Sequence, residues 1–200
     1  MTGHEPQPLP PDDLASRNPE LLKVVAGEKM HRVYPREFGP TYFDKSKGSR
    51  FNAPDGSYGV MYTSANVEGA FVETVLRGRR DVMIDTGYIR TRGMAALRAT
   101  EELTFVLLAG PSLSRLGCDA DVCHRAAPYD APQAWSKALH ETFPDVHGIA
   151  YRSRHDDNEI CYAVFERAKH LVEEVERTEP VDRHSDFWTL VDKYELELAA

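Results

Sequence analysis

The order of strand-like and helix-like segments along the chain most constrains its fold. Short runs rich in β-branched and aromatic residues predict strands at 30–34, 58–63, 82–84, 103–109, 148–152 and 160–165. Apolar periodicity and caps predict helices after Asn18 up to Gly27 and at 65–77, 112–117, 131–143 and 186–198. Because strands and helices do not alternate strictly, the sequence favours an α+β fold over a doubly wound parallel sheet.

Length and residue usage narrow the class of protein. The chain has 200 residues, enough for one domain with its own core, and the first 11 residues, with four prolines, predict a loose arm. No apolar run approaches the ~18 residues that cross a bilayer. Three cysteines are too few for a disulfide framework. We therefore expect one cytoplasmic domain without a membrane partner.

Charge is unevenly distributed along the chain. The net charge is −8, yet residues 29–50 hold six bases and only two acids. An acidic chain is a poor generic binder of nucleic acid, so we expect no direct nucleic-acid partner. Aromatic side chains between the arginines suit a nucleotide, with rings for the base and guanidinium groups for the phosphates. A solvated loop pinned by a few aromatics is the alternative, and the composition leaves both open.

Glu73 and Ser153 are candidate catalytic residues, but each also has a purely structural interpretation. Glu73 falls nearer the polar face than the apolar stripe of helix 65–77, where a pairing with Arg77 at i+4 is the simpler expectation. Ser153 ends the strand 148–152 and lacks the glycines of a nucleophile elbow, so it reads as a turn residue. Cys118, Cys123 and His124 match no zinc spacing. We expect no metal.

Three segments taken together resemble a known family. They are HRVYPREFGP, GSRFNAPDGSYGVMYTSANVEGAFVET and HGIAYRSRHDDNEICYAVF. Their order is similar to that of the RES domain family, named for an arginine, a glutamate and a serine, which here would be Arg32, Glu73 and Ser153. The resemblance covers about residues 28–166. It leaves residues 1–27 as an arm and helix, and 167–200 as an acidic segment whose terminal helix we expect to pack on the same domain.

The resemblance implies a fold, an activity and a site. RES proteins look like ADP-ribosyltransferase toxins, with a largely antiparallel, twisted sheet flanked by helices. They are typically toxins that consume NAD. Some members cleave its nicotinamide–ribose bond with water or phosphate, and at least one is thought to transfer ADP-ribose to a protein. Their usual partner is an antitoxin of the Xre type. By this resemblance Arg32, Glu73 and Ser153 are catalytic, and the NAD-binding residues are Arg32, Tyr42, Arg50, Tyr62 and Ser153.

Three points stay open at this level. The acceptor is water, phosphate or a protein, and the sequence does not choose among them. A non-catalytic nucleotide-binding module is the alternative to an enzyme. The amphipathic tail also leaves a homodimer open, although such a stripe more often belongs to the core.

Overall fold

The computed structural model describes residues 8–77 and 83–199. The strands are β1 (Leu21–Val24), β2 (Lys29–Pro35), β3 (Val60–Ser64), β4 (Met83–Asp85), β5 (Arg92–Ala99), β6 (Leu103–Leu108), β7 (Gly148–Arg152), β8 (Ile160–Phe165), β9 (Val172–Thr178) and β10 (Glu197–Ala199). The α-helices are α1 (Val67–Val75), α2 (Thr86–Arg90), α3 (Pro111–Leu116), α4 (Asp121–His124), α5 (Asp130–Thr142) and α6 (Phe187–Lys193). Short 3-10 turns occupy Leu14–Ser16, Glu166–Leu171 and Val181–Arg183.

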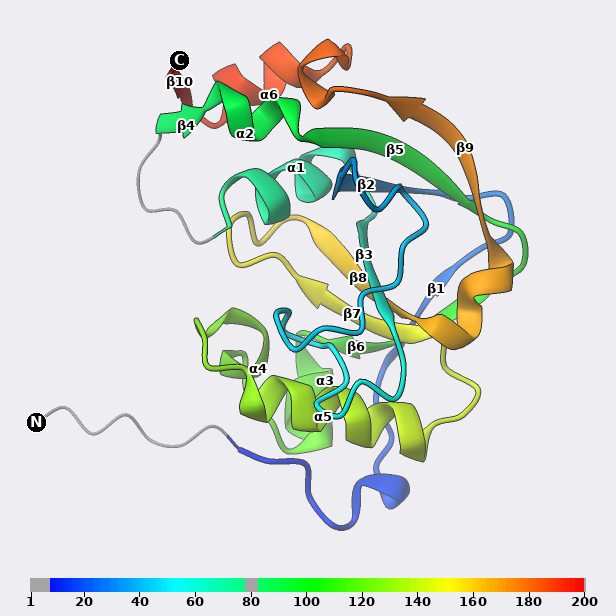
Figure 1. The fold of residues 1–200 in the computed structure, drawn as a ribbon. Coiled ribbons are helices and arrows are strands. Elements are labelled where there is room, and N and C mark those ends of the chain that lie inside the picture. Colours follow the sequence, from blue (N-terminus) through cyan, green and yellow to red (C-terminus); the bar gives the residue numbers. More distant parts are fainter. Residues whose placement is uncertain (1–7, 78–82, 200) are drawn as a thin grey trace, which may run out of the picture.

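Eight strands form one curled sheet in the order β1-β6-β7-β8-β3-β2-β5-β9. Every neighbouring pair is antiparallel except β6 and β7. Helices α3, α4 and α5 gather at the β6–β7 end, α1 packs beside β2, and α2 and α6 lie at the β5–β9 end (Figure 1). The predicted α+β class is confirmed.

The predicted N-terminal helix is wrong, because residues 21–24 form β1. This strand pairs antiparallel with β6, from Leu21 opposite Val106 to Val24 opposite Leu103. β6 is central to the core and needs a hydrogen-bonding neighbour on its outer edge. Fewer than two helical turns fit between Pro19 and Gly27, so pairing outweighs the weak local helix preference. The carbonyl of Pro8 accepts a bond from Trp135 Nε1 at 2.8 Å, which anchors the described end of the predicted loose arm.

The predicted terminal helix is shorter than 186–198. α6 ends at Lys193, and Glu195 takes a left-handed backbone conformation with φ +50°. After this turn Leu198 pairs with Ile84, so β10 runs parallel to β4. The apolar periodicity therefore continues past the helix because strand residues also enter the same core cluster. α6 packs on the domain through Phe187, whose ring meets that of Phe71 in α1 edge-on.

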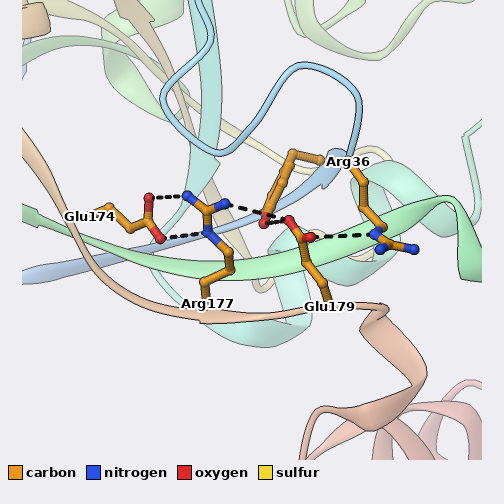
Figure 2. Close-up of polar contacts among 5 residues, drawn as sticks. Arg36, Glu174, Arg177 and Glu179 are labelled. Carbon is orange, nitrogen blue, oxygen red and sulfur yellow. Dashed lines mark hydrogen bonds and ion pairs between the residues drawn. The ribbon is translucent and has the colours of Figure 1, made fainter.

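Charged side chains fasten the outer strand β9 to the end of β2. Arg177 forms a forked pair with Glu174, and Glu179 lies between Arg177 and Arg36 (Figure 2). Glu179 also accepts a 2.5 Å bond from the hydroxyl of Tyr34, whose ring is fully buried. Burial raises the pKa of Tyr34, so its hydroxyl stays protonated and acts as a donor. The network fixes the end of β2, where the long 36–59 loop begins.

Gly148 begins β7 at a point where the backbone of β8 comes close. A Cβ at this position would lie 2.2 Å from the Ala163 carbonyl oxygen and 3.0 Å from the Phe105 ring. We expect Gly148→Ala to lower the free energy of unfolding by at least about 2 kcal/mol, since the strand must move or overpack. Chemical denaturation measures this. Gly48→Ala is the control, because its Cβ meets only the Ser46 hydroxyl at 3.3 Å, and an equal loss in both variants would contradict the prediction.

Candidate functional site

The sheet separates between β2 and β3. Within the described residues their ladder consists of one pair, His31 opposite Ser64. Beyond it the long loop enters, and Asp44 exchanges both backbone hydrogen bonds with Val60 at 3.0 Å. The residues of β2 after His31 thus have no strand on that side. The space they leave is part of a cavity of about 780 Å³, within the size range of small-molecule sites.

Five of the six residues predicted for the site line this cavity. They are Arg32, Tyr42, Arg50, Tyr62 and Glu73. β2, β3, α1 and the loop between β2 and β3 supply them, so residues up to 41 positions apart in the sequence share one wall. Ser153, the sixth, is fully buried and lines a neighbouring cavity of about 490 Å³. It contacts the main site through Glu73.

Glu73 is held by Ser153. The Ser153 hydroxyl donates a 2.6 Å bond to Glu73 Oε1, and its oxygen accepts from the backbone N–H groups of His155 and Asp156 at 3.1 and 3.3 Å. The turn after β7 therefore sets the direction of the hydroxyl. The simpler expectation of an exposed Glu73 paired with Arg77 fails, since Glu73 is half-buried at the cavity wall and Arg77 instead donates to the Gly48 carbonyl at 2.8 Å.

Arg32 has two tasks at this wall. Its side chain is buried, and Nη1 donates to the carbonyls of Pro40 and Tyr42 at 2.8 Å each. Burial lowers the pKa of Arg32 to about 10, so the guanidinium remains charged at neutral pH. The arginine holds the loop in place and brings a positive charge to the cavity at the same time.

Asn52 organises the same loop from inside. Its amide nitrogen donates to Asp44 Oδ2 at 2.8 Å and to the Ser46 carbonyl at 2.6 Å. Its amide oxygen accepts a 3.0 Å bond from the Tyr62 hydroxyl, which in turn accepts from the Phe51 N–H at 2.8 Å. Tyr62 is thereby fixed with its ring against the cavity.

Aromatic side chains flank the cavity near its arginines. The Arg50 guanidinium donates to the Arg125 carbonyl at 2.6 Å and lies 5.2 Å from the centre of the Tyr129 ring. Tyr42 stacks on Phe38 with ring centres 4.7 Å apart, and both rings are exposed to solvent. Such paired rings present a flat surface on which a planar ligand can stack.

The cavity is cationic inside an acidic chain. Its lining contains five arginines (Arg32, Arg50, Arg77, Arg92 and Arg154) against two carboxylates (Asp44 and Glu73). Burial lowers the pKa of the two lining histidines, His31 and His155, so both are neutral near pH 7. The arrangement favours an anionic ligand with one carboxylate available to it.

Several lining residues carry no sequence signal of their own. Tyr129 and Arg92 lie in segments without a motif, and only the fold brings them to the cavity. Tyr151, Arg154 and His155 surround Ser153 in the sequence, so the HGIAYRSRH segment could have indicated them.

Residues 8–77 and 83–199 contain neither a metal-ligand cluster nor a membrane-spanning helix. No group of three or more His, Cys, Asp or Glu side chains in these ranges is placed to hold a metal ion. None of the helices in the same ranges is long and apolar enough to cross a membrane. The three cysteines are free, and the Cys123 thiol, whose pKa is raised by burial, donates to the Leu108 carbonyl.

Fold and cavity define an α+β protein with a split, mostly antiparallel sheet and a cavity lined by more arginines than carboxylates. The chain belongs to the RES domain family, whose family model matches residues 29–189. The match runs past residue 166 and includes β9, which completes the large sheet.

One solved structure gives a whole-chain comparison of the fold. A chain from the crystal structure of the M. tuberculosis MbcT–MbcA toxin–antitoxin complex superposes with a TM-score of 0.64 at 12% identity. The alignment covers 86% of this chain and 90% of that chain. The likeness is consistent with the ADP-ribosyltransferase-like fold that the family resemblance implies. No curated protein matches the sequence.

Proposed function

We propose that this protein is an NAD-degrading enzyme that cleaves the nicotinamide–ribose bond. The observation that carries the proposal is the Glu73 carboxylate, held by Ser153 at the wall of a cavity that also contains Arg32 and Arg50. Membership in the RES domain family supports it, since members of that family consume NAD. NAD is the substrate here, and no metal takes part in the proposed step.

Cleavage of the nicotinamide–ribose bond requires few protein side chains. The bond from ribose C1′ to the nicotinamide nitrogen breaks, its electron pair goes to the ring, and neutral nicotinamide leaves. Positive charge builds on the ribose in an oxocarbenium-like transition state, as in glycoside hydrolysis. A carboxylate aimed at that charge stabilises the transition state more than the ground state. Glu73 supplies this carboxylate, and Ser153 positions it.

The arginines and aromatics bind the rest of the substrate. Arg32 and Arg50 offer guanidinium groups to the two charges of the pyrophosphate. Tyr62, fixed through Asn52, walls off the ribose, and Tyr42 faces a ring of the dinucleotide. The acceptor then adds to C1′: water gives ADP-ribose after losing a proton, and inorganic phosphate gives ADP-ribose 1″-phosphate.

The products test the proposal directly. The purified chain is incubated with NAD, with and without inorganic phosphate, and nicotinamide and the ribosyl products are identified by chromatography and mass spectrometry. Release of nicotinamide supports the enzyme, and the second product identifies the acceptor. Intact NAD under every condition contradicts it. A second candidate, transfer of ADP-ribose to a protein, follows from the same bond cleavage. A protein that becomes labelled when the chain is incubated with a labelled NAD analogue would favour this candidate.

The proposed biological role is that of a cytoplasmic toxin of a bacterial toxin–antitoxin pair. The structural neighbour is described as a toxin–antitoxin complex, and the family resemblance suggests an Xre-type antitoxin as partner. Co-expression with the product of the adjacent gene tests this role. Recovery of growth and co-purification of both chains are the expected results, and the mass of the free chain in solution tests for a homodimer.

A further inference from the structure

The proposed cleavage leaves one proton without an acceptor in the protein. When water adds to ribose C1′, its oxygen forms the new bond and one of its protons must leave. Glu73 stabilises the positive charge on the ribose only while it stays ionised, so a second group has to take that proton. Such a group needs a lone pair at neutral pH and a place within hydrogen-bond reach of the water.

His155 lies beside Glu73 at the wall of the main cavity, which both residues line. A short chain of hydrogen bonds links them. The His155 backbone N–H donates to the Ser153 oxygen at 3.1 Å, and the Ser153 hydroxyl donates to Glu73 Oε1 at 2.6 Å. Burial lowers the pKa of the His155 imidazole, and the negative charge of Glu73 acts in the opposite direction. The imidazole therefore lies within electrostatic reach of the carboxylate.

The His155 ring is able to accept a proton. Within residues 8–77 and 83–199, neither of its nitrogens has a hydrogen-bond partner, and neither is shut off from solvent. Burial and the positive charges of Arg154 and Arg50 lower its pKa, which outweighs the effect of Glu73. The ring is thus neutral at pH 7, and one nitrogen keeps a lone pair.

Water can approach this imidazole from the second cavity. Arg154 and His155 line both cavities, so the turn after β7 lies between them. The second cavity is also lined by the polar residues His124, Asp156 and Asp157, and polar surroundings of this kind hold water. A water molecule can therefore reach the His155 ring while the dinucleotide of the proposed function fills the main cavity.

We propose that His155 is the general base of the reaction, whose ring nitrogen takes a proton from the water that attacks ribose C1′. The inference rests on the proposed function and specifies water as the acceptor. The water oxygen bonds to C1′, the electron pair of the broken bond stays with nicotinamide, and the proton passes to His155 and then to solvent. The products are nicotinamide, ADP-ribose and one proton. The phosphate dianion needs no such base, because it attacks through an oxygen that already carries the charge.

The experiment separates the base from the carboxylate by a change of nucleophile. His155→Gln removes the basic nitrogen and keeps the backbone N–H that bonds Ser153. We expect ADP-ribose formation to fall by about 10²-fold, the lower end of the range for general bases, because an oxocarbenium-like centre reacts readily with water. His170→Gln is the matched control, since His170 is exposed and lines neither cavity. It should hydrolyse NAD at the unmodified rate.

Azide tests whether the loss is that of a base. This anion has no proton to lose, so it should restore nicotinamide release in His155→Gln by forming ADP-ribosyl azide. Glu73→Gln should stay slow with azide, because the charge that stabilises the transition state is missing and the amide fills the same space. Restored release also shows that His155→Gln is folded and binds NAD.

Two further measurements report on the imidazole itself. Hydrolysis by the unmodified chain should fall as the pH is lowered through the pKa of His155, in the range between about pH 5 and 8, because the protonated ring has no lone pair. His155→Gln should lack this step. NMR titration of the histidine rings gives the pKa of His155 directly, and Glu73→Gln should lower it, since the carboxylate that raises it is gone.

The possible failures are distinguishable. Unreduced ADP-ribose formation in His155→Gln, an equal loss with water and with azide, or a His155 pKa that Glu73→Gln does not move overturns the base. Nicotinamide release by the unmodified chain only in the presence of phosphate also overturns it, and the proposed function stands. Intact NAD with water, phosphate and azide alike contradicts the proposed function and removes the base with it.

Discussion

Glu73→Gln is expected to bind NAD like the unmodified chain and to lose about 10²- to 10³-fold in kcat, the range seen when one preorganised electrostatic contact is removed. The amide has nearly the same shape and can still accept the 2.6 Å bond from the Ser153 hydroxyl. What disappears is the negative charge that stabilises the oxocarbenium-like transition state. Nicotinamide release measures turnover, and calorimetry measures binding.

A matched change on the same helix controls for helix effects. Glu68→Gln removes a carboxylate from the first turn of α1, where Glu68 pairs with Lys193 at 3.6 Å and does not line the cavity. We expect this variant to keep full activity. Unreduced turnover in Glu73→Gln would remove Glu73 from the reaction, and reduced turnover in both variants would trace the effect to the helix.

The fold was predictable wherever local pattern and packing agree. β3 follows from its β-branched and aromatic residues and α1 from its helical apolar stripe, and both contribute side chains to the core. β5 has no such signal, because its RGMAALRA sequence is rich in alanine, which disfavours strands. It is a strand because β2 and β9 pair with its two edges. Gly93 fits this role, since a Cβ there would lie 2.7 Å from the Tyr34 ring.

β9 was missed for a different reason. Its VEEVERT sequence is mostly exposed, as suits the outer strand of a sheet, and no buried alternation remains to detect. The acidic composition of the C-terminal segment thus concealed a strand. The charges that indicate a solvated tail in the sequence also keep an edge strand from pairing with other chains.

The candidate site was indicated by the family resemblance and not by periodicity. Helical spacing places Glu73 nearer the polar face and away from the stripe that packs on the sheet, and this placement is correct. The polar face of α1 nevertheless borders the cavity, because β2 and β3 separate beside it. No one-dimensional pattern contains that separation, which depends on where the 36–59 loop inserts Asp44.

Arg32 is the residue whose replacement should affect binding most. Nη1 is committed to the carbonyls of Pro40 and Tyr42, while the other N–H groups of the guanidinium take no part in those two bonds. Arg32→Lys keeps a charge but loses the fork that matches two phosphate oxygens, and we expect the Kd for NAD to rise by about tenfold or more. Calorimetry in the Glu73→Gln background measures this without turnover.

Removing the charge completely should add a loss of stability to the loss of affinity. In Arg32→Leu the two carbonyls lose their donor inside the protein, which costs about 1–3 kcal/mol for each group left unsatisfied. Both effects arise from one side chain, because the guanidinium that we propose as a phosphate ligand also holds the loop that forms the cavity wall. Arg98→Leu is the control, since Arg98 is exposed, pairs with Glu173 on the outer strand and does not line the cavity. Unchanged affinity in Arg32→Lys would assign Arg32 to the loop alone and leave Arg50 as the phosphate ligand.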